Sequence, residues 1–177
     1  MEKKLFTVSD IVRIAIMAAL TAVCSWIIVP MPQIPFTMQT FAVFFALEFI
    51  GGRNGTIAFF VYALLGAVGV PVFSGFRGGI GHLVGPTGGY LLGFVFTCFI
   101  YWIFEKRYTY KSVKHYFVLA LGLFACYFCG TVWFVAVVKT NVWTALVTCV
   151  LPYIIPDAAK IAFAVFLAAK LKKVIKV

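Results

Sequence analysis

The sequence predicts an all-α membrane protein, a single bundle of six transmembrane helices with both termini in the cytoplasm. Three observations lead to this fold class. Of the 177 residues, 64% are hydrophobic and only 11% are charged, whereas soluble domains carry about 25% charged residues. The apolar residues fall in six stretches separated by polar or Gly/Pro-rich breaks. The basic residues collect in every second break, as they do in loops on the cytoplasmic side of a membrane.

The first three spans are expected over residues 11–29, 36–50 and 56–70. Thr7 and Asp10 precede the first span at the spacing of a helix N-terminal capping box. The second span begins after a proline-rich break and ends at a Gly-Gly-Arg-Asn turn, and the third ends before a proline. The second and third are short, at about 15 residues each, since a spanning helix needs roughly 20.

The last three spans are expected over residues 86–104, 116–138 and 142–169. A long Gly/Pro-rich outer loop, residues 71–89, connects the third and fourth helices, and Pro86 suits the first turn of the fourth. A basic loop, residues 105–115, precedes the fifth span. The sixth stretch is interrupted by two prolines. Nothing is left over for a soluble domain, so residues 1–177 are expected to form one domain.

The distribution of charge supports this topology. The chain has 15 Lys and Arg against five Asp and Glu, a formal net charge of +10. With both termini inside, 12 of the 15 cations face the cytoplasm, Arg77 and Lys139 lie outside, and Lys160 lies within a span. Because the cations alternate with apolar stretches, they indicate membrane orientation and contact with anionic lipid rather than nucleic-acid binding.

The outer half of the bundle is predicted to be irregular. All seven prolines fall on the outer side, and seven of the 15 glycines lie within residues 71–89. Irregular backbone at membrane depth is tolerated only where it is buried in protein or lines a cavity. The sequence therefore predicts a binding pocket that opens outward.

Asp157 and Lys160 are the strongest candidates for a binding site. They stand three residues apart on the last helix and therefore share a face. Lys160 lies roughly 15 Å from the expected inner interface, near the middle of the membrane. Each charge there costs about 2.5–3.5 kcal/mol, so both side chains should face protein or a cavity. The alternative is an ion pair that only fixes this helix.

The Gly-rich segment is the second candidate. Gly79 and its neighbours allow backbone to approach a ligand closely, and the amides of Thr87, Gly88 and Gly89 would lie at a positive helix end that attracts carboxylates or phosphates. Arg77 either clamps an anionic group or holds the loop at the interface. Alternatively, the segment is a flexible turn, or its glycines form a helix-packing face. The sequence contains no P-loop, so it predicts no ATP hydrolysis by this chain alone.

Several single residues have two open interpretations. Gln39 is expected to hydrogen-bond either a ligand or a neighbouring helix, and Tyr90 either stacks on a ligand ring or packs. Small residues four apart on the first helix, which let another helix approach closely, form either an internal contact or a surface for a partner protein; these are Ala15, Ala18, Ala19 and Ala22.

The sequence gives little support to an enzyme or a channel. Ser74 and His82 share a loop, but no acid is placed to orient them, and the inner half lacks the polar stripe of a channel. His82 and His115 are expected on opposite sides, and Glu48 is expected to reach the inner interface as a structural residue. The five cysteines lie in apolar stretches as packing residues, so no metal site is expected.

The sequence resembles the BioY family, the biotin-binding S components of bacterial energy-coupling factor (ECF) transporters. The similarity covers most of the chain and is carried by three segments: Pro35-Phe36-Thr37-Met38-Gln39-Thr40, Arg77-x-Gly79 through Gly85-Pro86-Thr87-Gly88-Gly89-Tyr90 to Phe94, and Asp157-x-x-Lys160.

This resemblance implies a non-enzymatic subunit in the bacterial cell membrane that captures biotin and needs no cofactor. It implies that Asp157, Lys160 and the Gly-rich loop help to bind biotin. Asp157 can accept from a urea N–H, Lys160 can donate to the urea oxygen, and Arg77 or the Thr87–Gly89 amides can meet the carboxylate. The face of Ala15 and Ala19 resembles the family's docking surface for a transmembrane coupling subunit, which works with two ATPases. Another small vitamin as ligand is the alternative.

Overall fold

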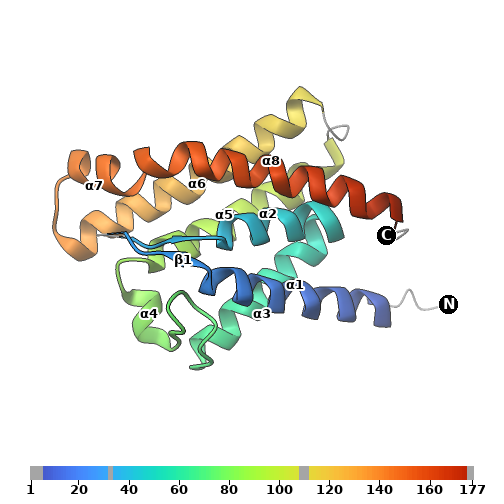
Figure 1. Cartoon of the computed structure of the whole chain (residues 1–177), viewed down its shortest axis with the longest axis horizontal. Coiled ribbons are helices and arrows are strands. Elements are labelled where there is room, and N and C mark those ends of the chain that lie inside the picture. The colour runs from blue at the N-terminus through green and yellow to red at the C-terminus, as the bar shows by residue number, and fades with distance from the viewer. Residues whose placement is uncertain (1–5, 32–33, 108–111, 175–177) are drawn as a thin grey trace.

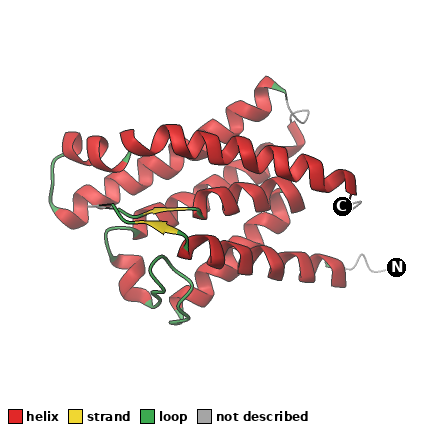
Figure 2. Ribbon diagram, viewed as in Figure 1, coloured by secondary structure: helices red, strands yellow, loops and turns green. Residues whose placement is uncertain are grey.

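The structure is a computed structural model that describes residues 6–31, 34–107 and 112–174. The described chain is almost entirely helical (Figures 1 and 2). Its α-helices are α1 (Val8–Trp26), α2 (Gln39–Ile50), α3 (Gly52–Ala67), α4 (Ile80–Val84), α5 (Gly88–Phe104), α6 (Val113–Val138), α7 (Val142–Cys149) and α8 (Leu151–Val174). Part of the expected basic loop, residues 108–111, lies outside the described residues.

Short non-helical elements complete the fold. A 3-10 turn, Glu105–Arg107, extends α5, and two strands of two residues each, β1 (Ile28–Val29) and β2 (Phe36–Thr37), pair antiparallel. Ile28 pairs with Thr37 in this ladder. The hairpin lies between α1 and α2, in the proline-rich break of the sequence.

Several of these helices can cross a membrane. Among the described residues, α1, α5 with its 3-10 extension, and α6 are long and apolar enough to do so, and α7 with α8 forms a fourth candidate that is bent by 41°. The all-helical membrane fold is thus confirmed, while the count of six spans stays a prediction. α1 begins and α8 ends at the same end of the molecule, opposite α4, β1 and α7 (Figure 1).

Helix α2 is the core of the bundle. All 12 of its residues are buried, and it packs mainly against α8, α3 and α1. A helix that is hydrophobic all round is stable only when surrounded by other elements. The second apolar stretch of the sequence can therefore be short, because protein rather than lipid surrounds α2 on every side.

The local sequence signals explain most helix ends. Thr7 and Asp10 form the predicted capping box, with the Asp10 amide donating to Thr7 Oγ1 at 3.2 Å. The expected sixth stretch divides at Val150 into α7 and α8, and Pro156 lies inside α8. Proline has no backbone N–H to donate, so the carbonyl oxygen one turn before Pro156 has no hydrogen-bond partner within the helix.

Helix α6 begins at Val113, before the expected start, with Ser112 as its N-cap. His115 therefore lies in the first turn of a helix rather than in a loop, and its Nε2 is 2.7 Å from Glu48 Oε1. Both side chains are fully buried. The expectation that Glu48 reaches the membrane interface is wrong, because α2 is enclosed and the carboxylate finds its partner within the protein.

Candidate functional site

One cavity stands out among the described residues, at the end of the bundle that carries the β1–β2 hairpin. It contains about 690 Å³ of space not filled by atoms, part of it open to solvent. Small-molecule sites combine largely apolar walls with a few precisely placed polar groups. The apolar part of its wall includes Ile34, Phe36, Leu91, Phe94 and Leu123.

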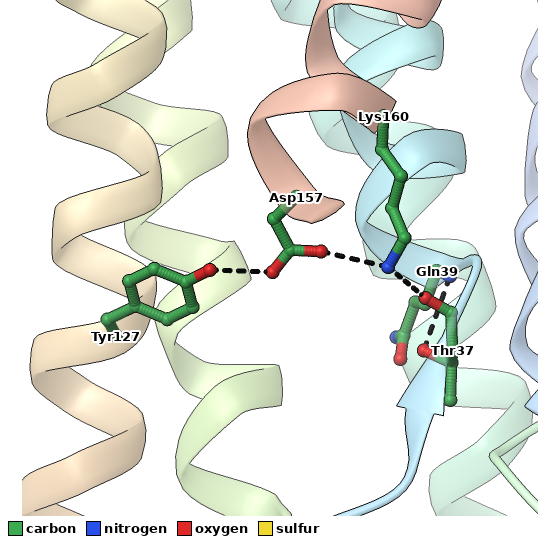
Figure 3. A network of polar contacts seen from close by, with 5 residues as sticks. All are labelled: Thr37, Gln39, Tyr127, Asp157 and Lys160. Atoms are coloured by element: carbon green, nitrogen blue, oxygen red, sulfur yellow. Dashed lines mark hydrogen bonds and ion pairs between the residues drawn. The ribbon is translucent and has the colours of Figure 1, made fainter. Parts of the chain in front are cut away.

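Asp157 and Lys160 lie together in the wall of this cavity, on α8. Lys160 Nζ donates to Asp157 Oδ1 at 2.8 Å, and the two side chains are each 7% exposed (Figure 3). The two charges are thus paired and almost completely removed from solvent. A buried carboxylate and ammonium with a cavity beside them are suited to hold a small polar group by hydrogen bonds.

Tyr127 is a third member of this cluster, and sequence reasoning did not identify it. Tyr127 lies on helix α6, and its hydroxyl donates to Asp157 Oδ2 at 2.7 Å. It approaches the carboxylate from the side opposite Lys160 (Figure 3). It also lines the cavity. Tyr127 lies in the middle of an uninterrupted apolar run, so no spacing motif marks it. Only its depth in the membrane, similar to that expected for Asp157, offered a signal.

The ammonium group of Lys160 is fully engaged by the protein. Besides Asp157, Nζ donates to the carbonyl oxygen of Thr37 at 2.6 Å. It also lies 3.5 Å from the centre of the Phe36 ring, in a cation–π contact. Thr37 and Phe36 form β2, so Lys160 ties the hairpin to α8. A ligand acceptor must share Lys160 with these groups or displace one of them.

Gln39 lines the same cavity at the first position of α2. Its Nε2 donates to the hydroxyl of Tyr62 on α3 at 3.2 Å. A side-chain amide carries two N–H groups and an acceptor oxygen. Gln39 therefore contacts a neighbouring helix and still has hydrogen-bonding capacity toward the cavity, so both of its sequence interpretations are compatible with its position.

The Gly-rich segment divides between lining and packing roles. Thr87 and Tyr90 line the cavity, whereas Gly79, Gly88 and Gly89 do not. The amide of Gly88 donates to Gly85 O at 3.0 Å, so it is not available to an anion. A Cβ on Gly89 would overlap Trp133 of α6. Gly89 thus serves the helix-packing alternative, as does Gly93, where a Cβ would lie 2.6 Å from Cys126 Cα.

Gly79 has a conformational role of its own. Its φ angle of 90° lies in the region that favours glycine, and this turn starts α4. Gly79 itself does not line the cavity.

Arg77 lies apart from Asp157 and Lys160. It is exposed and lines a second, more open hollow together with Pro30, Met31 and Pro86. This hollow shares Pro35, Ser74, His82 and Thr87 with the main cavity. The structure therefore places Arg77 at the outer approach to the cavity instead of inside it.

His82 lies where the two hollows meet. Its ring stacks on Phe73 with centroids 5.1 Å apart, and its Nε2 lies 3.3 Å from Thr87 Oγ1. Burial, and secondarily the positive charge of Arg77, lower the pKa of His82 below its usual value of 6.5. The neutral imidazole is therefore favoured in the fold.

The small residues of α1 differ in their exposure. Ala18 and Ala22 are buried in the core, at 4% and 6% exposure. Ala15 and Ala19 are exposed, beside the exposed apolar side chains of Ile11, Val12 and Ile16. The predicted partner surface can thus include Ala15 and Ala19 only, since Ala18 and Ala22 make internal contacts.

The five cysteines are free thiols, four of them buried. Among the described residues, no group of three or more His, Cys, Asp or Glu side chains is placed to hold a metal ion. Cys126 and Cys149 line the cavity as small, soft apolar groups.

The chain matches the BioY family over residues 1–177. It is 36% identical over 163 residues to the "Probable biotin transporter BioY" of Pyrococcus horikoshii, covering 92% of this chain and 96% of that protein. It is 36% identical over 169 residues to the "Biotin transporter BioY" of Thermotoga maritima, covering 93% and 96% of the two chains.

A solved structure has the same fold. It is the crystal structure of "the S-component for biotin from an ECF-type ABC transporter", and the two chains superpose with a TM-score of 0.85. The superposition covers 94% of this chain and 92% of the other, at 25% sequence identity.

Proposed function

Because this chain belongs to the BioY family, we propose that it is the biotin-binding S component of an ECF-type transporter. The observation that carries the proposal is the buried Asp157–Lys160 pair in the wall of a largely apolar cavity that is partly open to solvent. Such a site binds a compact ligand with a polar group at one end. The protein performs no reaction; it binds biotin as cargo and needs no cofactor.

The chemistry of biotin matches the lining of the cavity. The fused rings are compact and apolar, and the urea offers two N–H donors and one acceptor oxygen. Each oxygen of Asp157 already receives one hydrogen bond, from Lys160 or Tyr127, and can accept another from a urea N–H. The urea oxygen finds N–H donors in the amide of Gln39 and in Lys160. The Lys160 ammonium is then shared with Asp157 and the Thr37 carbonyl.

The carboxylate of biotin is best met at the outer approach. Arg77 lies in the hollow that adjoins the cavity, and its guanidinium can bind a carboxylate through two parallel hydrogen bonds. The Gly88 amide, in contrast, donates within the turn. The arrangement thus favours biotin with its urea toward Asp157 and its side chain toward Arg77.

Transport requires partners, because the sequence holds no ATP-binding motif. The protein works with a transmembrane coupling subunit and two ATPase subunits in the cell membrane of a bacterium. Six spans with both termini in the cytoplasm satisfy the charge distribution, and the exposed face around Ala15 and Ala19 of α1 is the docking surface for the coupling subunit.

Binding of labelled biotin to the purified protein tests this proposal. Asp157→Asn and Lys160→Ala should each weaken binding by roughly 10- to 100-fold, the value of one charge-assisted hydrogen bond. Lys173→Ala on the same helix, where the side chain is exposed, should leave binding unchanged.

Two outcomes would contradict it. Unchanged affinity in both cavity variants would remove the pair from the site. Absence of biotin binding, together with saturable binding of a different small vitamin, would assign the protein to another ligand.

A further inference from the structure

We propose that Tyr127 is a positioning residue, which fixes the direction of the Asp157 carboxylate and thereby sets the affinity for ligands that offer an N–H donor. The inference rests on the proposed binding of biotin. It assigns Tyr127 a role that acts through Asp157, without direct contact with the ligand.

The first step is the way in which the carboxylate is held. Lys160 Nζ donates to Oδ1 at 2.8 Å, and Tyr127 Oη donates to Oδ2 at 2.7 Å (Figure 3). The two donors come from opposite sides, so each fixes a different oxygen. Together they define the plane of the carboxylate, and each oxygen keeps a lone pair for a further donor.

The second step concerns the helices that supply these groups. α6 packs mainly against α5, and α8 packs mainly against α2. The hydrogen bond between Tyr127 and Asp157 therefore links two helices, α6 and α8, that each pack mainly against a different helix. Both residues line the cavity. The hydrogen bond sets the carboxylate at the place where the two helices border the ligand space.

The third step is the state expected without the hydroxyl. Rotation of an aspartate about its terminal torsion is soft, and Lys160 lies only three residues away on the same helix. Without Tyr127 as a donor to Oδ2, the carboxylate is free to turn both oxygens toward Lys160. The lone pairs of both oxygens would then face Lys160, and neither oxygen would face an N–H of the ligand. A ligand would have to undo this contact before it could bind.

The experiment is a double-mutant cycle on biotin affinity with Tyr127→Phe and Asp157→Asn. Tyr127→Phe removes only the hydroxyl, so the aromatic ring still fills its place. It should weaken binding by roughly 10- to 100-fold in the wild-type background. In the Asp157→Asn background, where the carboxylate to be oriented is gone, the same substitution should change affinity by less than about threefold. Asparagine keeps one acceptor oxygen, so binding there stays measurable.

Tyr116→Phe is the matched control. Tyr116 is on the same helix, is 50% exposed and does not line the cavity, so loss of its hydroxyl should not alter affinity. The melting temperature of each variant shows whether the fold is retained.

The other outcomes are distinguishable. Equal losses in both backgrounds would overturn the inference, because they would mean that Tyr127 contacts the ligand itself or only supports the fold. Unchanged affinity of Tyr127→Phe in the wild-type background would also overturn it. Failure of the wild-type protein to bind biotin would instead refute the proposed function.

Discussion

At the scale of single residues, the cavity is organised around charges that the protein satisfies internally. Lys160 donates to Asp157 and to the Thr37 carbonyl, and it also faces the Phe36 ring. Tyr127 donates to the other oxygen of Asp157, and each oxygen can still accept a further hydrogen bond. Ligand selectivity then depends on which of these contacts a ligand can share. A site built around a fixed hydrogen-bonding group rejects analogues that lack the matching group by several orders of magnitude.

His82 makes the outer end of the cavity sensitive to pH. Its pKa is lowered by burial and by Arg77, so the unfolded chain binds its proton more readily than the fold does. The stabilising contribution is complete above the ordinary pKa of about 6.5 and is lost as the pH falls below it. We expect the melting temperature to decrease between about pH 7.5 and about pH 5.5.

His82→Gln should make the melting temperature less dependent on pH, because glutamine stays neutral over this range. Thermal denaturation at several pH values, with wild type and variant side by side, checks this. An unaltered pH profile in the variant would assign the dependence to another group.

At the scale of elements, α2 and α6 are joined by a buried pair on the side of the bundle away from the hairpin. Glu48 and His115 are fully buried and 2.7 Å apart, and Glu48 Oε2 has no hydrogen-bond partner in the described structure. Removal of one partner leaves an uncompensated polar group in an apolar interior. Losses of about 1–3 kcal/mol, and more for a charged group, are typical when a buried hydrogen-bonding group loses its partner.

A double-mutant cycle on this pair should therefore show strong coupling. Glu48→Ala and His115→Ala should each destabilise the protein, and the double variant should lose clearly less than the sum of the two. Denaturation in detergent micelles measures the unfolding free energies, with Lys114→Ala as the exposed control on the same turn of α6. Additive losses would show that the two side chains act independently.

The elements also show what the sequence can and cannot predict. Periodicity was sufficient to place Asp157 and Lys160 on one face, because both lie on one helix. It could not find Tyr127 or the Glu48–His115 pair, since each of these contacts joins residues far apart in the chain. Hydropathy likewise located α2 but could not show that protein encloses it, so the expected exposure of Glu48 was wrong. For Gly88 and Gly89, composition could not separate ligand approach from helix packing.

At the scale of the whole molecule, the surface of α1 around Ala15 and Ala19 is the proposed docking region for a partner. Ala15 and Ala19 lie among exposed apolar side chains, whereas the neighbouring Ala18 and Ala22 are buried. Small residues let another helix approach closely. The cavity is lined by other elements and includes no residue of α1, so docking and ligand binding use separate parts of the fold.

This separation predicts variants that bind but do not transport. Ala15→Trp or Ala19→Trp should reduce biotin uptake in cells that contain the coupling proteins to background, because the indole blocks close helix approach. Biotin affinity of the purified variants should stay within about twofold of wild type, since the cavity is untouched. Ala136→Trp, the same change at an exposed position on α6, should retain uptake. Intact uptake in the Ala variants would refute the docking surface.

The self-contained pairing of Asp157 and Lys160 has a consequence for the return of an unloaded carrier. After a subunit has delivered its cargo, its binding site is empty. An unpaired charge in the hydrocarbon region would raise the free energy of that empty state. Here the two opposite charges offset each other, and Tyr127 and Thr37 occupy the neighbouring hydrogen-bonding positions. Discharge leaves a neutral interior, so the protein can start the next cycle without importing a counter-ion or a proton.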